Sequence, residues 1–181
     1  MRLLISASLC IACVLSNAGE CLTATVKRVV DGDTIVVSTE GGEQKVRLLR
    51  VNTPESVHPD QKQNNEAGRA ASKWVAEQLL GKTVELEKET EEADQHGRLL
   101  RYIFLDGRNF CVAIVRAGHS PYYTAFGHGK YREEFEKAEK EARDQKLAIW
   151  SDAELTEKYL RLKSKWGKDA KRADAKETAK P

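Results

Sequence analysis

The segment Leu22–Val51, LTATVKRVVDGDTIVVSTEGGEQKVRLLRV, decides the fold expected of this chain. β-Branched residues dominate 24–30 and 34–38, and Asp31-Gly32-Asp33 separates these two runs with residues typical of turns. A second turn over 39–43 leads into a further strand over 44–51. The pattern predicts a meander of β-strands in which Asp33 stands at the entrance to the second strand.

Beyond this meander, the spacing of apolar residues predicts two more strands and three helices. The strands are expected at 83–89 and 99–105, and the helices at 65–80, at 131–146 and between Asp106-Gly107 and Gly118. Segment 53–64 contains two prolines and reads as a loop. Five strands with helices inserted late favour an α+β fold, a five-stranded OB-type β-barrel with three helices, whose face commonly binds nucleic acid.

The two ends of the chain differ from the central domain, 19–151. Arg2, the apolar run 3–15 and Ser16-Asn17-Ala18 are typical of a signal peptide over 1–18 and predict export to the periplasm or out of the cell. No later segment is apolar enough to enter a membrane, so we expect a mature chain without membrane insertion and, by default, a monomer. The charged tail 152–181 is expected to be weakly helical over 155–166 and disordered from 170 onward.

Charge is unevenly distributed along the chain, whose formal net charge is +2. Residues 151–181 hold nine Lys and Arg against six Asp and Glu, and Arg2 adds one positive charge, so that 19–150 carry a net −2. A general polyanion-binding field is therefore excluded for the central domain, and nucleic acid would have to be bound by local geometry. Two of the four cysteines, Cys21 and Cys111, remain after the signal segment, either as a disulfide or as two unpaired thiols.

Several oxygen-bearing residues follow the predicted strands. Asp33 offers a carboxylate, Asn52 an amide oxygen and Thr53 a backbone carbonyl, which are the hard donors that Ca²⁺ takes. Glu55 follows the rigid Pro54, where a carboxylate can orient or deprotonate a water nucleophile. These residues predict a cation site with a general base beside it.

Two arginines complete the predicted chemistry. The planar guanidinium fork fits phosphate oxygens, and one arginine on each side can neutralise the charge that grows as a fifth ligand joins phosphorus. Arg47 lies in the strand that leads to Asn52, and Arg98 follows His96-Gly97. Arg47, Glu55 and Arg98 together predict the cleavage of a phosphodiester bond.

Further motifs extend this pattern along the chain, namely His58-Pro59, Asp94-Gln95-His96-Gly97-Arg98, Val115-Arg116-Ala117-Gly118 and Ala148-Ile149-Trp150-Ser151. With them the chain resembles the thermonuclease family of staphylococcal nuclease-like enzymes over residues 22–151. The resemblance implies that Asp33, Asn52 and the Thr53 carbonyl hold Ca²⁺, that Glu55 positions the attacking water, and that Arg47 and Arg98 bind the scissile phosphate. It also implies endonucleolytic cleavage of DNA and RNA that leaves 3′-phosphate ends.

The chain departs from the family's pattern at three places. Asn52 stands where the best-known member has a second metal-binding aspartate, which removes one charge from the cation site. His96 and Gln95 replace a tyrosine and a lysine that contact the terminal nucleotide phosphate, so His96 is a candidate phosphate contact. Segment 120–129 matches loosely.

In that loosely matching segment, Tyr122, Tyr123 or Phe126 either stacks on a base or fills the protein. The alternative to catalysis is a non-catalytic nucleic-acid-binding OB module. Arg47, Glu55 and Arg98 together argue for catalysis, because a module that only binds has no need of all three.

Overall fold

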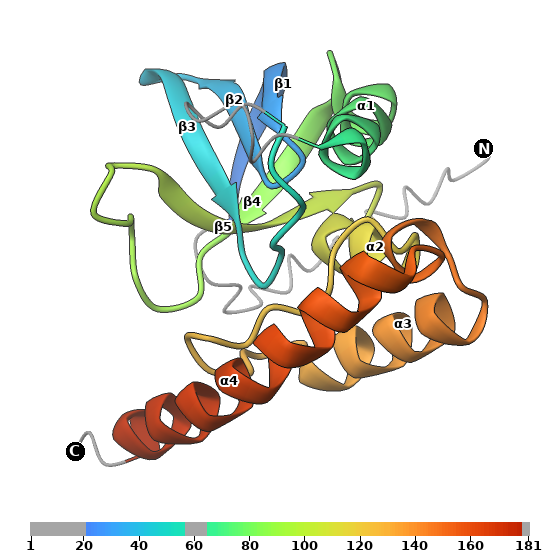
Figure 1. Ribbon diagram of the computed structural model, residues 1–181. Helices are drawn as coiled ribbons and strands as arrows, with labels where there is room; N and C mark the ends of the chain where they lie inside the picture. Colours follow the sequence, from blue (N-terminus) through green and yellow to red (C-terminus); the bar gives the residue numbers. More distant parts are fainter. Residues whose placement is uncertain (1–20, 57–64, 179–181) are drawn as a thin grey trace, which may run out of the picture.

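The computed structural model describes residues 21–56 and 65–178, and the side chains of 22–56 and 65–175 (Figure 1). The predicted signal peptide and His58-Pro59 lie outside the described residues, as does the side chain of Cys21. No described helix has the length and apolar character needed to cross a membrane.

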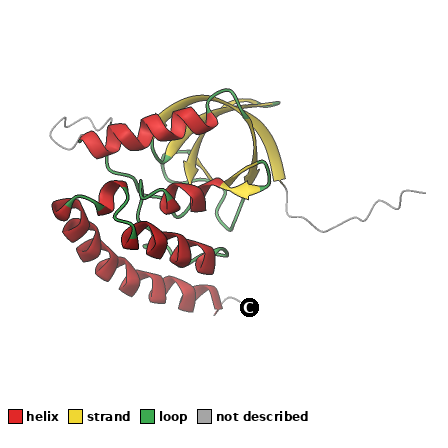
Figure 2. Ribbon diagram, turned by 90° about the vertical axis from the view of Figure 1, so that its right-hand side faces the viewer, coloured by secondary structure: helices red, strands yellow, loops and turns green. Residues whose placement is uncertain are grey.

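The strands form a closed barrel, seen nearly end-on in Figure 2. The sheet order is β3-β2-β1-β4-β5-β6, and a parallel pairing between β3 and β5 closes it. The bounds are β1 Cys21–Asp31, β2 Thr34–Thr39, β3 Gly42–Leu48, β4 Thr83–Glu87, β5 Leu99–Leu105 and the short β6 Arg108–Asn109. The α+β fold with a five-stranded OB-type barrel is confirmed, and β6 only extends one edge of the sheet.

The strand register brings distant motifs to one place. Asp31 pairs with Thr34, which leaves Gly32-Asp33 as a two-residue turn. Thr34 pairs in turn with Arg47 on β3, and Arg47 pairs with Leu100 on β5. Asp33, Arg47 and the segment that enters β5 at Arg98 therefore meet at the same edge of the barrel.

Helix α1, Glu66–Leu79, packs against the barrel through its periodic small and apolar residues. Ala71, Val75 and Leu79 are completely buried at the four-residue spacing of one helix face. Asn65 caps the helix, because its side chain accepts a hydrogen bond of 2.8 Å from the Gly68 amide. This cap sets where the loop after Asn52 rejoins the core.

The remaining helices form a layer beneath the barrel (Figure 1). They are α2 Phe110–Arg116, α3 Arg132–Asp144, a 3-10 turn Ala148–Trp150 and α4 Ala153–Thr178. The barrel core includes Cys111, which is a free, completely buried thiol, and burial raises the pKa of this thiol to about 12. Whether Cys21 is a free thiol lies outside the described side chains.

The C-terminal segment corrects the expectation of a partly disordered tail. Helix α4 is continuous from Ala153 to Thr178, so it adds a fourth helix and covers most of 170–181. Tyr159, Trp166 and Ala170 are buried along one face of α4, where the first two join a second apolar cluster with Trp150. Burial of this face stabilises a helix whose composition alone indicates disorder.

The exterior of α3 is also less uniformly solvated than its charged sequence indicates. Glu139 on α3 is 7% exposed, and its carboxylate pairs with Lys163 of α4 at 2.7 Å. The same carboxylate accepts a hydrogen bond of 2.9 Å from the Tyr122 amide. Glu139 is thus a buried link between α3, α4 and the loop that carries Tyr122.

Candidate functional site

Asp33 and Arg47 form the centre of the candidate site. Arg47 Nη2 lies 3.0 Å from Asp33 Oδ2, and Arg47 Nη1 donates hydrogen bonds to the carbonyls of Leu48 at 2.8 Å and Val51 at 2.7 Å. These contacts use three of the five N–H donors of the guanidinium group and leave two for a ligand. The side chain is therefore held in one orientation before any substrate arrives.

Arg98 lies beside this pair and is held by Asp94. Arg98 Nε and Nη2 lie 2.7 and 2.6 Å from Asp94 Oδ2, and Arg98 Nη1 lies 3.5 Å from Thr34 Oγ1. Thr34 Oγ1 donates to Asp33 Oδ1 at 2.9 Å, so the two arginines are joined through Thr34 and Asp33. Burial would raise the pKa of the Asp94 carboxyl, but the hydrogen bonds from Arg98 lower it below its ordinary value.

A pocket of about 580 Å³ opens beside the two arginines. Its lining includes Arg47, Arg98 and His96 together with the aromatic residues Tyr123 and Phe126. His96 is exposed, and its amide donates to Asp94 Oδ1 at 2.9 Å, which places it on the turn that presents Arg98. Tyr123 is half-buried, whereas Phe126 is 76% exposed at the rim. The pocket is thus lined by two guanidinium groups and by aromatic side chains that are at least partly exposed.

The predicted cation ligands lie just beyond this pocket, around the turn at Gly32. A Cβ on Gly32 would fall within 2.7 Å of the Thr53 side chain, so the segment after β3 packs closely on the Gly32-Asp33 turn. The Asn52 amide donates to Ser120 Oγ at 2.8 Å, which fixes the backbone between Asn52 and Thr53. Asn52 and Thr53 therefore lie beside the Gly32-Asp33 turn, directly after Val51, whose carbonyl binds Arg47.

The pKa of the Asp33 carboxyl lies above its ordinary value. Burial raises the pKa of the Asp33 carboxyl, and the charges and hydrogen bonds of Arg47, Thr34 and Arg98 oppose that rise. Thr53 Oγ1 is buried without a hydrogen-bond partner among the described residues. Within those residues no group of three or more His, Cys, Asp or Glu side chains is arranged to hold a metal. The donor set is thus one carboxylate with neutral oxygens.

Glu55 is exposed, and its backbone is fixed by α1. The Glu55 carbonyl accepts a hydrogen bond of 3.1 Å from the Asn65 amide, and a Cβ on Gly68 would lie only 2.2 Å from that carbonyl. The carboxylates of Asp33 and Glu55 both act on the buried Tyr159 hydroxyl, whose pKa is raised by burial first and then by these charges. Glu55 therefore belongs to the same neighbourhood as Asp33, outside the lining of the pocket.

Two supporting residues were not anticipated from the sequence. Asp31 is buried and accepts hydrogen bonds from Ser56 Oγ at 2.7 Å and Ser72 Oγ at 2.9 Å, so it anchors the turn to α1. Arg50 is buried at a positive φ of 62°, pairs with Glu89 and donates to the carbonyls of Phe126 and Gly127 at 2.9 Å. Both residues lie inside the motifs quoted above. A charged residue within or next to a predicted strand was the one sign in the sequence that pointed to them.

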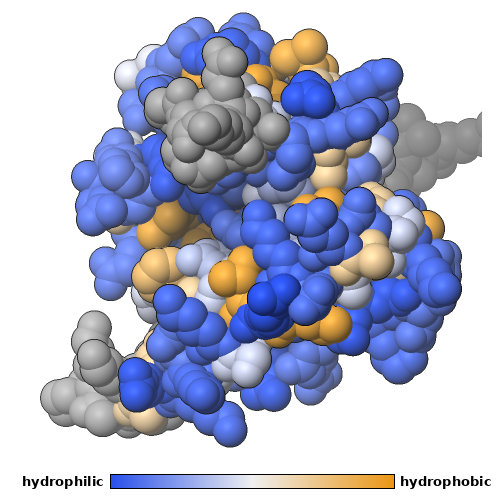
Figure 3. Space-filling model, viewed as in Figure 1, coloured by the Kyte–Doolittle hydropathy of each residue, from blue (hydrophilic) through white to orange (hydrophobic). Residues whose placement is uncertain are grey.

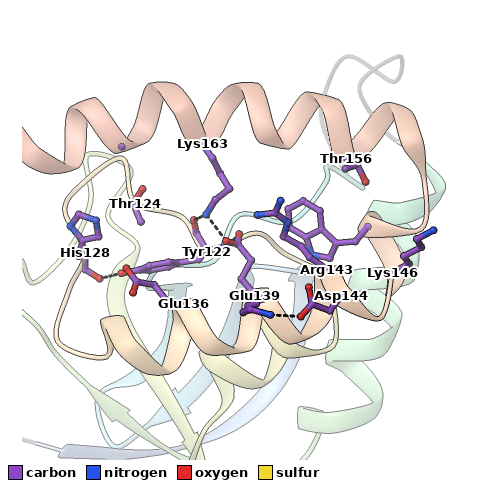
Figure 4. A pocket seen from close by; sticks show the side chains of 13 residues that line it. Tyr122, Thr124, His128, Glu136, Glu139, Arg143, Asp144, Lys146, Thr156 and Lys163 are labelled. Atoms are coloured by element: carbon purple, nitrogen blue, oxygen red, sulfur yellow. Dashed lines mark hydrogen bonds and ion pairs between the residues drawn. The ribbon is translucent and has the colours of Figure 1, made fainter.

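Tyr122 is wrongly placed among the candidate substrate contacts. It is 2% exposed, its ring stacks on Phe135 at 5.0 Å, and its hydroxyl donates to the His128 carbonyl. Tyr122 lines a second pocket, of about 700 Å³, between α3 and α4 (Figure 4). Tyr122 does not line the pocket of Arg47 and Arg98, whereas Tyr123 does, so Tyr123 is the candidate that remains of the two.

Known proteins are similar to this chain over most of its length. The family described as staphylococcal nuclease homologue matches residues 45–152. The chain is 39% identical over 127 residues to a thermonuclease of Staphylococcus intermedius, covering 69% of this chain and 74% of that protein. It is 37% identical over 138 residues to a thermonuclease of Staphylococcus hyicus, covering 76% and 80%.

A third relative is the SPbeta prophage-derived endonuclease YokF of Bacillus subtilis strain 168, which is 35% identical over 134 residues, 73% of this chain and 45% of that protein. The barrel, the paired arginines beside Asp33 and these similarities agree with one another. The chain therefore belongs to the staphylococcal nuclease homologue family.

Proposed function

We propose that this chain is an exported, Ca²⁺-dependent endonuclease that hydrolyses phosphodiester bonds of DNA and RNA and leaves 3′-phosphate ends. The observation that carries the proposal is the linkage of Arg47 and Arg98 through Thr34 and Asp33 at one edge of the barrel. The names of the relatives, two thermonucleases and an endonuclease, support the nuclease class.

The two arginines account for phosphate binding and for stabilisation of the transition state. Arg47 has two N–H donors left after its fixed contacts, and Arg98 is oriented by Asp94. Because both guanidinium groups are held by protein contacts, little reorganisation is needed as negative charge accumulates on the phosphoryl oxygens. Tyr123 and Phe126 at the same pocket offer surfaces on which a neighbouring base can stack.

The residues around the Gly32 turn fit a hard divalent cation. Asp33, the Asn52 side chain and the Thr53 carbonyl are oxygen donors, and the low charge of this set suits a cation that also keeps waters and phosphate oxygens as ligands. A bound Ca²⁺ would supply positive charge to the scissile phosphate and lower the pKa of a coordinated water. Glu55 would then accept a proton from the attacking water. Cleavage on the 5′ side of phosphorus would give the 3′-phosphate.

Digestion assays test this proposal. Purified protein should cut supercoiled plasmid and a structureless RNA with Ca²⁺, stop in excess EGTA and resume when Ca²⁺ is restored. End-labelled products should carry 3′-phosphates, which phosphatase treatment converts to 3′-hydroxyl ends. Retained cleavage in EGTA would overturn the calcium requirement, and tight binding without cleavage under any divalent cation would indicate a non-catalytic OB module.

Export is tested separately from chemistry. The signal pattern over 1–18 predicts that an expressing cell yields a chain beginning near Gly19 outside the cytoplasm. N-terminal sequencing of the periplasmic and culture fractions gives the result directly. Recovery of the uncut chain in the cytoplasm alone would contradict export and leave the nuclease proposal untouched.

A further inference from the structure

Helix α4 carries a line of positive charge on its outer face. Five exposed basic residues follow one another at alternating steps of three and four positions, and we call them the basic stripe: Lys158, Arg161, Lys165, Lys168 and Arg172. At 3.6 residues per turn these side chains span about 80° of the helix circumference and about 21 Å of its length. A helix used only for packing does not require such regularity on its solvent side.

Three members of the basic stripe have no ion-pair partner in the described part of the chain. Arg161 pairs with Glu157 at 2.8 Å, and Lys158 lies 5.8 Å from the centre of the Tyr159 ring. Lys165, Lys168 and Arg172, by contrast, form no ion pair with a described residue. Their charges are therefore available to an anionic partner without the breaking of an internal contact.

Helix α4, which carries the basic stripe, packs beside the candidate site. Tyr123, which lines the pocket with Arg47, packs edge-on against Trp166 of α4 with ring centres 4.7 Å apart. The backbone at Gly127 fits so closely on α4 that a Cβ there would lie 2.8 Å from Asp174 Oδ1. The loop that carries the exposed Phe126 thus packs on the C-terminal part of α4, on the side of the helix turned away from Arg172.

Trp166 and Asp169 mark the side of α4 that faces the pocket, since Trp166 packs against Tyr123 and the charge of Asp169 also acts on the Tyr123 hydroxyl. On a helix of 3.6 residues per turn, Asp169 is about 20° from Lys158 and about 40° from Lys165. Glu139 and α3 lie against the other flank, through Lys163. Figure 1 shows α4 running along the outside of the molecule, below the barrel and in front of α3, and Figure 3 shows the same face dominated by hydrophilic residues.

We propose that the basic stripe binds the sugar–phosphate backbone of a single nucleic-acid strand whose scissile phosphate occupies the pocket. This inference rests on the proposed function and extends it to nucleotides outside the cleavage site. The partner is sequence-independent, because phosphates are alike at every position and Phe126 can stack on any base. The stripe contributes affinity for long substrates and has no part in the chemical step.

A nucleic acid fits this surface better than a lipid membrane does. A basic helix that lies on a membrane buries its apolar face among the acyl chains. In α4 that face is occupied, since Tyr159, Trp166 and Ala170 are at most 7% exposed against the protein itself. A polynucleotide needs only the charged face, which is the one that α4 presents to solvent.

The test compares two triple variants of the full chain that lose the same charge. The first is Lys165→Gln, Lys168→Gln and Arg172→Gln, and the control is Lys27→Gln, Lys82→Gln and Lys137→Gln, all exposed positions elsewhere on the molecule. Circular dichroism and thermal unfolding check that both are folded. Fluorescence anisotropy with a long oligothymidylate, in EDTA so that no cleavage occurs, gives the affinity as a function of salt.

The stripe variant should bind the long oligothymidylate about tenfold more weakly at physiological salt, and its log–log salt slope should fall by about two, as expected for three lost single-strand phosphate contacts. The control should keep the parent's slope. In the presence of Ca²⁺, the stripe variant should raise KM for a long strand and leave cleavage of a tetranucleotide unchanged. The binding assay does not depend on cleavage. A protein that binds through the stripe and shows no cleavage would therefore contradict the proposed function and leave the inference about the stripe intact.

An unchanged affinity and slope in the stripe variant would overturn the inference, whether or not the protein cleaves. So would lost binding to vesicles of anionic phosphatidylglycerol with unchanged oligothymidylate affinity, which would assign the face to a membrane. Equal losses in the stripe variant and the control would also overturn it, because they would trace binding to overall charge.

Discussion

At the scale of single residues, the arrangement of Arg47 argues that its shape matters as much as its charge. Its guanidinium group is fixed at once by Asp33 and by the carbonyls of Leu48 and Val51. A lysine can supply the charge, but its single ammonium group cannot hold these contacts and present two parallel donors to a phosphate. The strand register sets the position of this guanidinium group, since Arg47 pairs with Thr34 on the neighbouring strand.

We expect Arg47→Lys to lower kcat by roughly two orders of magnitude, about 3 kcal/mol of transition-state stabilisation. Steady-state rates on a defined oligonucleotide provide the measurement. Arg28→Lys, at an exposed position of β1, is the matched control and should keep the parental rate. Near-normal turnover of Arg47→Lys would contradict a role of Arg47 in binding the scissile phosphate.

Asn52 offers a second prediction at this scale. Because Asn52→Asp adds a charge to a donor set that holds one carboxylate, Asp33, it should tighten Ca²⁺ binding about tenfold. Titration calorimetry measures the affinity directly. Asn109→Asp makes the same chemical change at the cap of α2, away from the site, and should leave the affinity unaltered. Equal or weaker binding by Asn52→Asp would place Asn52 outside the cation site.

Some residues of the candidate site could be identified from the sequence, and others could not. The candidate roles of Asp33, Arg47 and Arg98 came from joint motifs, and the register brings these three together. Tyr122 could not be told from Tyr123 because neighbouring residues in a loop have no periodicity that separates inside from outside. Its burial depends on Phe135, which lies on a different element.

Among the helices and strands, α3 and α4 are joined by a buried ion pair on faces that the sequence indicates to be solvated. Strand and helix positions followed from apolar spacing, and β5 has the predicted bounds, Leu99–Leu105. Helix α4 escaped this reasoning because Ala, Lys, Asp and Glu dominate its last turns, and its stability comes from tertiary contacts. Glu139 escaped it too, because its partner Lys163 is on another helix.

The α3–α4 pair predicts a specific loss of stability. Lys163→Met leaves the buried Glu139 carboxylate without its cation and should cost about 2 kcal/mol, below the full cost for a completely buried pair because Lys163 is partly exposed. Urea unfolding measures the difference. Lys140→Met breaks an exposed pair with Asp144 on α3 and should cost less than about 0.5 kcal/mol. Equal effects of the two substitutions would contradict a buried α3–α4 link.

A second pair ties the end of α4 to the pocket loop and predicts a dependence on pH. His128 Nδ1 lies 2.5 Å from Asp174 Oδ2, and although burial alone would raise the pKa of the Asp174 carboxyl, these contacts lower it. A lowered pKa means that the stabilisation is present above the ordinary carboxyl range and is lost as the pH falls through the folded-state value.

Asp174→Asn should therefore destabilise the protein by about 0.5 kcal/mol near neutral pH, a modest value because Asp174 is partly exposed. The difference from the parent should hold down to the ordinary carboxyl pKa of 3.8 and vanish as the pH falls through the lower folded-state pKa of Asp174. Thermal unfolding over a pH series gives the comparison, with Asp169→Asn on the same helix as control. A difference that persists unchanged in acid would rule out this pair as its source.

At the scale of the whole molecule, the barrel and the helical layer act as one body around the site. Arg50 binds the loop of Phe126 to Glu89, and Tyr123 and Trp166 join that loop to α4. The general architecture was predictable because the strands follow chain order within each of two runs, β1 to β3 and β4 to β6. The closing β3–β5 pairing and the packing of α4 were not, because both depend on contacts between segments far apart in sequence.

The match to the family begins at residue 45, inside β3, and ends at 152, one residue before α4. The family match is therefore shorter than the folded unit of this chain. A fragment cut at those borders would lose β1 and β2, which pair with β4 and β3, and would uncover the apolar surface around Trp150. Anyone who grafts this catalytic centre onto another protein would have to transfer both flanks as well.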